Sequence, residues 1–170
     1  IKALYEKYGK LTVVHMDAHR DLAFDFIGEK YSHATVMRRV HELGADLVQI
    51  GIRSFSKEED EFVKSTYNIQ TFKNKDVHKH MDAIEYYLTN IGGPIYISID
   101  MDVLDPSIAP NVGNPVPCGL FVSELEDIIR TLSHKNIVGF DVVETASNRL
   151  GDSTAVVGAK LIYDFLTLIE

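Results

Sequence analysis

The sequence predicts an α/β protein built on a parallel sheet that helices cover on both faces. Short runs of β-branched and apolar residues alternate along the chain with longer segments whose apolar residues recur at helical spacing. The short runs are almost continuously apolar, which is typical of strands buried on both sides. No repeat, low-complexity tract or linker divides the 170 residues, so we expect a single domain over 1–170.

Each expected element has a local signal. The strands are the apolar runs at 11–16, 47–50, 69–72, 95–99 and 137–140. The helices are 1–8, 32–43, a short charged one opened by Ser56 and Glu59, one capped by Asp76 that ends near Leu88, one opened by Ser123 and Glu126, and 154–170. Gly9 and Gly44 are expected helix ends. The first helix has an end signal but no start signal, so we expect residues upstream of it.

The composition excludes several classes of protein. Lys and Arg number 17 and Asp and Glu number 25, a formal net charge of −8, so neither nucleic acid nor an anionic membrane surface is an expected partner. The single cysteine, Cys118, excludes a disulfide framework and a cysteine-rich zinc site, and we interpret it as a passive thiol. No apolar run approaches the roughly 20 residues of a membrane span, and no signal peptide is visible. We therefore expect a cytoplasmic protein.

Ligand-type residues follow two of the expected strands. They are Asp17, His19 and Asp21 after the first strand, and Asp100 and Asp102 after the fourth. Alternate residues of extended chain share a face, and ligand sites of parallel sheets lie beyond the carboxyl ends of the strands. Either motif alone is often a loop cap. Two such clusters at equivalent strand ends favour a metal site.

The balance of charge in these clusters indicates which metal to expect. Four carboxylates at one edge of a sheet repel one another and raise each other's pKa, whereas two divalent cations neutralise them. Carboxylate-rich ligation with little imidazole suits manganese better than zinc. Two ions about 3.5–4 Å apart hold a bridging water as hydroxide near neutral pH.

Several other residues are candidates for supporting roles. His33, at a helix start, is either a proton shuttle or a cap or surface histidine. Glu144, after the last strand, is either the partner of a guanidinium or a solvated loop residue. Asp141 is either a support for the site or a simple cap, and His15 is expected to pack in the core or behind the ligands, with a role as a ligand itself as the less favoured alternative. Surface positions are expected for His41, His78, His80 and His134.

Together these motifs resemble those of the ureohydrolases, the arginase and agmatinase family of dinuclear manganese hydrolases. Residues 14–21 are similar to the family's Asp-Ala-His-x-Asp motif, and 98–106 to its Ser-x-Asp-x-Asp-x-x-Asp-Pro motif. Residues 139–144 match its third motif, so the resemblance covers essentially the whole chain. The segment 31–35, Tyr-Ser-His-Ala-Thr, resembles the agmatinase version of the substrate loop, which favours agmatine over arginine.

The resemblance implies a three-layer α/β/α domain around a mostly parallel, eight-stranded sheet, with the N-terminal strands missing from this chain. It implies two Mn²⁺ ions per subunit, both bridged by Asp17 and Asp100. Asp21 would complete the shell of one ion and hold the bridging hydroxide. His19 and Asp102 would complete the shell of the other. Such proteins are usually trimers or hexamers.

The resemblance also implies a reaction. Glu144 would bind the guanidinium of a small guanidino substrate, the hydroxide would attack its central carbon, and His33 would protonate the leaving amine. The products would be urea and an amine, which is putrescine if the substrate is agmatine, a step of polyamine biosynthesis.

Three departures from the family pattern keep alternatives open. The family's further ligand histidine, in a Gly-Gly-Asp-His segment upstream of Asp17, is not in this sequence. The family loop Pro-Gly-Thr-Gly-Thr-Pro is Pro-Asn-Val-Gly-Asn-Pro at 110–115, and Thr-Ala-Ser follows Glu144 where the family has a small residue and proline. The alternatives are an arginase or guanidinobutyrase-like substrate, a non-catalytic homologue that serves as an oligomeric scaffold, and a zinc deacetylase related in fold.

Overall fold

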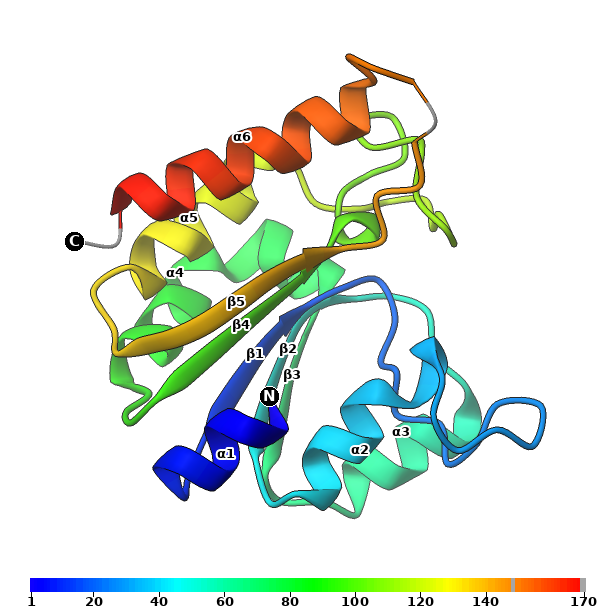
Figure 1. Cartoon of the computed structure of the whole chain (residues 1–170), viewed down its shortest axis with the longest axis vertical. Helices are drawn as coiled ribbons and strands as arrows, with labels where there is room; N and C mark the ends of the chain where they lie inside the picture. Colours follow the sequence, from blue (N-terminus) through cyan, green and yellow to red (C-terminus); the bar gives the residue numbers. More distant parts are fainter. Residues whose placement is uncertain (148, 169–170) are drawn as a thin grey trace.

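The computed structural model describes residues 1–147 and 149–168. Its centre is a sheet of five parallel strands in the order β3-β2-β1-β4-β5 (Figure 1). The strands are β1 (Thr12–Met16), β2 (Asp46–Ile52), β3 (Ile69–Lys73), β4 (Ile95–Asp100) and β5 (Ile137–Val143). The five expected strands are therefore confirmed, while the eight strands implied for complete family members stay a prediction.

The helices form two layers, one on each face of the sheet (Figure 1). One layer contains α1 (Lys2–Tyr8), α2 (Val36–Glu42) and α3 (Lys57–Lys64), and the other contains α4 (Asn74–Asn90), α5 (Val122–Leu132) and α6 (Ser153–Leu168). Two short 3-10 helices, η1 (His33–Thr35) and η2 (Met101–Val103), precede α2 and follow β4. The three-layer architecture is thus confirmed. The expected last two residues of the final helix, 169–170, lie outside the described residues.

Each helix layer forms a core with its own side of the sheet. Every residue of β1 is buried, and successive side chains of a strand point to opposite faces. Val14 and Met16 therefore pack in the core with α4, α5 and α6, whereas Val13 packs in the core with α1 and α2. Each such side chain stabilises the fold by about 1.5–3 kcal/mol relative to exposure.

Three helix starts were expected from capping residues, at Ser56 and Glu59, at Asp76, and at Ser123 and Glu126. The first of them is confirmed. At α3 the backbone N–H of Glu59 donates to Ser56 Oγ at 3.2 Å, and the N–H of Ser56 donates to Glu59 Oε2 at 2.7 Å. The expected ends at Gly9 and Gly44 are also confirmed, since both lie just beyond a helix with positive φ, 74° and 97°.

The other two expected helix starts are wrong, because both helices begin earlier. Asp76 lies in the first turn of α4 and accepts a 3.0 Å hydrogen bond from the backbone N–H that precedes the helix. In α5 the same role falls to Glu124, at 2.8 Å, and not to the pair Ser123 and Glu126. A carboxylate three positions after the cap satisfies a free N–H whatever side chain the cap itself carries. The capping residue alone was therefore a poor guide.

The strand order brings the two acidic clusters together. The chain runs through β1, β2 and β3 toward one edge, then returns to the other side of β1 for β4 and β5. The strands that carry the clusters are therefore neighbours, with Met16 opposite Ile99. Ligand sites of open parallel sheets lie at this reversal, beyond the carboxyl ends of the strands.

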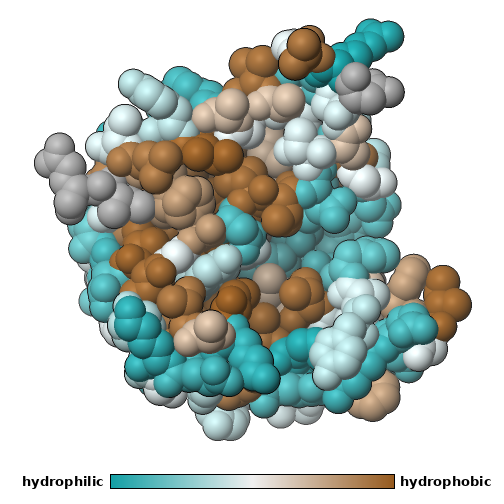
Figure 2. All heavy atoms as spheres, in the orientation of Figure 1, coloured by the Kyte–Doolittle hydropathy of each residue, from teal (hydrophilic) through white to brown (hydrophobic). Residues whose placement is uncertain are grey.

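The molecular surface has a hollow face between the two helix layers (Figure 2). Hydrophobic side chains gather along α6 on this face. The exposed large hydrophobic residues of α6 are Val156, Ile162, Tyr163 and Leu166. Among the described residues, no helix is long and apolar enough to cross a membrane.

Candidate metal centre

The carboxyl end of β1 positions the first two ligand-type residues. Asp17 is 1% exposed, and its Oδ1 accepts a hydrogen bond from the backbone N–H of His19 at 2.5 Å. Its Oδ2 lies 2.8 Å from Nε2 of His15, the residue two positions earlier on the same face of the strand. Both oxygens of Asp17 are thus held in place by groups of its own segment.

The carboxyl end of β4 contributes two more carboxylates. The chain turns there into η2, and Oδ1 of Asp100 accepts a hydrogen bond from the backbone N–H of Asp102 at 2.8 Å. Asp102 in turn reaches across to the first cluster, where its Oδ1 accepts from the N–H of Ala18 at 3.0 Å. This bond joins the two strand ends directly.

His19 contacts carboxylates of both clusters. Its Nδ1 is 2.9 Å from Asp102 Oδ2 and 3.4 Å from Asp17 Oδ1. On the other side of the ring, Asn114 contacts Nε2 at 3.1 Å, so a loop that comes after β4 also contacts this histidine. The clusters that follow β1 and β4 therefore form one site.

Asp21 completes the first cluster from a loop. Its backbone has φ of 54°, a left-handed conformation that is uncommon outside glycine but tolerated by aspartate. Its carbonyl oxygen accepts hydrogen bonds from the N–H groups of Met37 and Arg38, at the start of α2, at 3.0 and 3.1 Å. These bonds hold the loop, and the Asp21 side chain faces the same cavity as Asp17.

The cluster carries more negative charge than a buried site tolerates. Burial and the nearby charge of Asp17 raise the pKa of Asp21 to about 7, and burial together with Asp17 and Asp102 raises the pKa of Asp100 to about 9. Hydrogen bonds that the His19 ring donates to the carboxylates of Asp102 and Asp17 raise the pKa of His19 to about 10. In the absence of a cation, protons therefore take up part of the charge.

The donor atoms fit divalent cations. Two groups of side chains have ligand atoms within 4.8 Å of one another: His15, Asp17 and Asp21, and Asp17, His19 and Asp102. Asp17 belongs to both groups, as a residue that bridges two ions would. Oxygen-rich donors with an occasional imidazole suit a hard or borderline cation such as Mn²⁺.

Next to these ligands is a cavity of about 520 Å³, which His33 and Glu144 also line. His33 is exposed in η1 and packs edge-on against Phe26, with ring centroids 5.0 Å apart. Glu144 has φ of 61°, and a Cβ at Gly113 would lie 2.5 Å from its Oε2. The absence of a side chain at Gly113 therefore leaves the space that the Glu144 carboxylate occupies. Strained backbone of this kind is concentrated at functional sites.

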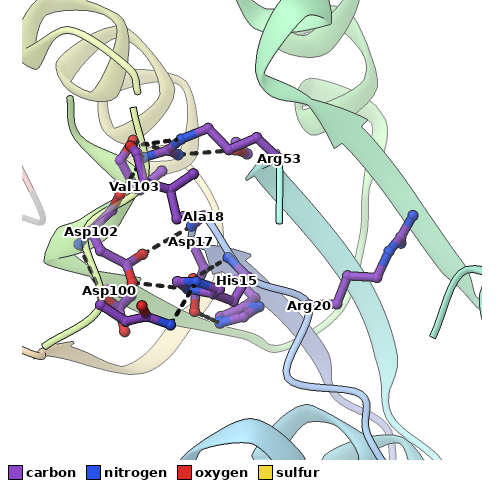
Figure 3. A network of polar contacts seen from close by, with 12 residues as sticks. His15, Asp17, Ala18, Arg20, Arg53, Asp100, Asp102 and Val103 are labelled. Atoms are coloured by element: carbon purple, nitrogen blue, oxygen red, sulfur yellow. Dashed lines mark hydrogen bonds and ion pairs between the residues drawn. The ribbon is translucent and has the colours of Figure 1, made fainter. Parts of the chain in front are cut away.

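Two arginines near the site were not anticipated from the sequence. Among the described residues, Arg53 donates hydrogen bonds to backbone carbonyls alone, the shortest to Asp102 at 2.6 Å and Val116 at 2.8 Å. It thereby ties η2 to the loop after β4. Arg20, within the first motif, points away from the cluster (Figure 3) and pairs with Asp60 at 3.2 Å. Contacts to backbone carbonyls leave no pattern in a sequence, so Arg53 could not be found there.

The remaining candidates behave as structural residues. Asp141 accepts hydrogen bonds from Tyr96 Oη at 2.7 Å and Ser98 Oγ at 2.8 Å, which makes it a support at the wall of the cavity. Cys118 is exposed. His78 pairs with Glu124, and His80 and His134 line no part of the site cavity. His41 is only half-buried and bonds to Asn68 at 3.0 Å, so its expected surface position is correct only in part.

Comparison with known proteins gives the family. A family model described as the arginase family matches residues 1–167. The chain belongs to the arginase family. The predicted resemblance to ureohydrolases is therefore confirmed.

Individual members of the arginase family align with most of this chain. An uncharacterized 32.2 kDa protein in the hmfB 3' region of Methanothermus fervidus is 44% identical over 161 residues, which are 94% of this chain and 56% of that protein. The agmatinase of Pyrococcus horikoshii is 36% identical over 88% of this chain and 52% of its own length. The solved arginase of Medicago truncatula has a TM-score of 0.83 and 36% identity, covering 99% of this chain and 54% of that one. The chain thus spans about half the length of these relatives.

Proposed function

We propose that this chain carries the dinuclear manganese site and the guanidinium-binding carboxylate of a ureohydrolase that converts agmatine to putrescine and urea. One observation carries the proposal. Ligand-type side chains from the ends of β1 and β4 line the same cavity as Glu144, a carboxylate in a strained backbone conformation. Family membership supports the reaction class.

Five side chains would hold the ions: Asp17, His19, Asp21, Asp100 and Asp102. Asp17 is the natural bridge, because its ligand atoms lie close to that of Asp21 in one group of donor atoms and to those of His19 and Asp102 in the other. When bound, two Mn²⁺ ions would supply Lewis acidity and a water that ionises near neutral pH. Their positive charge would also let Asp21 and Asp100 ionise, which the metal-free cluster resists.

The chain's own side chains would bind and orient the substrate. A guanidinium is planar and presents paired N–H donors, which match the two oxygens of Glu144. That pairing would direct the central carbon toward the acidic cluster, where Asp21 would accept a hydrogen bond from the attacking water. His33 would give a proton to the departing nitrogen as its bond to carbon breaks. The oxygen of the water thereby becomes the oxygen of urea, and the departing nitrogen leaves as a protonated amine.

The lining of the cavity favours a substrate without a carboxylate. Apart from three histidines, the ionisable side chains that line it are carboxylates, and among the described residues neither lysine nor arginine lines it. The carboxylate of arginine or guanidinobutyrate would find no lysine or arginine partner there. The amine tail of agmatine meets no such penalty. The names of the relatives do not decide the point, because an agmatinase and an arginase are both 36% identical to this chain.

Urea release by the full-length, Mn²⁺-loaded protein tests the proposal. We expect kcat/KM for agmatine to exceed the values for arginine and guanidinobutyrate by at least about tenfold, the discrimination that one unpaired buried charge provides. Asp102→Asn should lower kcat/KM by more than about 100-fold, beyond the effect of losing a residue that merely supports a ligand. Asp127→Asn, on the exposed side of α5, is the matched control.

Each alternative has its own result. Equal or faster urea release from arginine would make the enzyme an arginase. At most one bound ion per chain and no urea from any of the three substrates would indicate a non-catalytic scaffold, and zinc-dependent release of acetate would indicate a deacetylase. A trimeric or hexameric assembly and a cytoplasmic location belong to the same proposal. Light scattering of the purified protein tests the assembly.

A further inference from the structure

A row of polar side chains crosses the sheet one step before the acidic cluster. The register places one such residue on each strand, each opposite the next: Thr71, Gln49, His15, Ser98 and Asp141. All five face the layer formed by α1, α2 and α3. Since strands buried in parallel sheets are normally apolar throughout, polar side chains at this level of all five strands need a reason.

The orientation of the Gln49 side chain is fixed by a backbone carbonyl. Gln49 is fully buried, and its Nε2 donates to the carbonyl oxygen of Arg20 at 2.7 Å. A carbonyl can only accept, so the opposite orientation of the amide would bring two oxygens together. The observed orientation leaves Oε1 buried with no hydrogen-bond partner among the described residues. The two N–H groups are thus the part of this side chain that the site uses.

The second N–H of Gln49 determines where the proton of His15 lies. Gln49 Nε2 is 3.3 Å from Nδ1 of His15, which is 2% exposed. Because the amide nitrogen is a donor, Nδ1 must accept and carries no proton. The ring proton is then on Nε2, which faces Asp17 Oδ2 at 2.8 Å. Donation runs in one direction, from Gln49 to His15 to Asp17.

We propose that Gln49 is a positioning residue that acts through His15 to hold the carboxylate of Asp17 in the orientation that binds cations. The inference rests on the proposed function only in that Asp17 is a metal ligand; it requires no particular substrate. Without Gln49, the His15 ring could exchange its tautomer and present a lone pair to Asp17. Partners that orient metal ligands in this way typically contribute about 10–100-fold to metal affinity.

Two substitutions of Gln49 separate donation from packing. Gln49→Met keeps the length of the side chain but removes both N–H donors. Gln49→Glu keeps the shape but offers Nδ1 only acceptors, which favours a proton on Nδ1. Gln70→Glu, on the exposed side of β3, is the matched control. If Gln49→Glu does not fold, because its carboxylate meets the Arg20 carbonyl, Gln49→Met still provides every measurement below.

The first measurement is the tautomer itself, read from ¹⁵N chemical shifts of the imidazole and assigned by comparison with His15→Phe. In the parent protein we expect Nδ1 to be unprotonated and Nε2 to be protonated. In both Gln49 variants that pattern should be lost or mixed, and in Gln70→Glu it should persist. A parent protein with its proton on Nδ1, or variants with an unchanged pattern, would overturn the inference.

The second measurement is Mn²⁺ affinity, by titration of the full-length protein with the metal alone. Gln49→Met should weaken binding by about 10–100-fold, whereas in the His15→Phe background the same change should have less than a twofold further effect. Additive losses would show that Gln49 does not act through His15. The melting temperature in a chelator should separate this effect from general destabilisation.

The results distinguish a failure of this inference from a failure of the catalytic proposal. A parent protein that binds Mn²⁺ but releases no urea would reject the proposed reaction and leave both measurements intact. A parent protein that binds no Mn²⁺ would reject both proposals, because Asp17 would then not be a metal ligand. Catalysis by the parent with unchanged Mn²⁺ affinity in Gln49→Met would reject this inference alone.

Discussion

The two faces of the central strands belong to the same residues' backbone but carry side chains of different chemistry. On the face toward α4, α5 and α6, β1 and β4 present Val14, Met16, Ile97 and Ile99, all of them buried. On the face toward α1, α2 and α3, an apolar residue near the start of β1 is followed by His15 and then by the ligand-type Asp17. One face is apolar along its whole length, whereas the other becomes polar toward its carboxyl end.

The contrast shows how one sheet serves two purposes. The uniformly apolar face anchors the strands through close packing, which is insensitive to pH and to metal. The graded face places hydrogen-bonded polar groups behind charged ones, so that buried carboxylates are held in one orientation. Substitutions on the two faces should therefore fail in different ways, and three predictions test this, from the largest expected effect to the smallest.

The largest effect is expected on the apolar face. Ile97→Ala should lower the free energy of unfolding by about 2–5 kcal/mol, because it leaves a cavity in a packed core. Mn²⁺ affinity of the folded protein should change less than twofold. Ser98→Ala, the next residue but on the other face, should cost only about 1 kcal/mol, since it removes one hydrogen bond to Asp141. Denaturant unfolding measures both, and equal costs would contradict the contrast.

A smaller effect is expected from pH on the graded face. In the metal-free protein the pKa of Asp21 is about 7 and that of Asp100 about 9, against an ordinary value of 3.8. The folded protein therefore binds more protons than the unfolded chain in this range, so stability should fall as pH rises from about 4 to 9. His19, with its pKa raised from 6.5 to about 10, acts in the same direction above pH 6.5.

Melting temperatures between pH 5 and 9, with a chelator or with Mn²⁺, measure this loss. The chelated protein should lose at least about 5 °C across the range, and the Mn²⁺-loaded protein much less. Asp21→Asn, which suits the left-handed backbone, should remove Asp21's own share of the loss, which lies below about pH 7, and leave the share of Asp100 in place. A chelated protein whose melting temperature rises with pH would show that the pKa values of these carboxyl groups are not raised in the folded state.

The smallest effect is expected at the rim of the cavity. Gly113→Ala would place a Cβ 2.5 Å from Glu144 Oε2, so the carboxylate must move. We expect KM for the guanidino substrate to rise about 3–10-fold, a loss of roughly 0.7–1.4 kcal/mol in binding, with no change in Mn²⁺ affinity. Gly92→Ala is the control, because a Cβ there meets nothing within 4 Å. Equal KM values in the two variants would separate Glu144 from substrate binding.

Local patterns in the sequence predicted the strands, the layers and the meeting of the two acidic clusters. These features depend on hydrophobic periodicity and on the rule that parallel strands end at one edge, both of which act within short segments. The starts of α4 and α5 were misplaced, because Asp76 and Glu124 accept their bonds from inside the helix.

Which individual side chains of distant strands and loops meet was beyond the sequence. That Gln49 lies opposite His15 follows from the register of two strands, which no local pattern specifies. The left-handed conformations of Asp21 and Glu144 arise from loops held at both ends by the rest of the fold. The catalytic and metal roles of these residues stay predictions.

The way Arg53 binds its neighbours has a consequence for how this protein can diversify. Among the described residues, its guanidinium donates hydrogen bonds to main-chain oxygens alone, those of Gly51, Asp102, Val103, Leu104, Val116 and Pro117. Because these contacts use main-chain atoms, substitutions of side chains in the loop between Leu104 and Val116 do not remove them. Side chains of this loop can therefore vary while the ends of the loop and the position of Asp102 stay fixed.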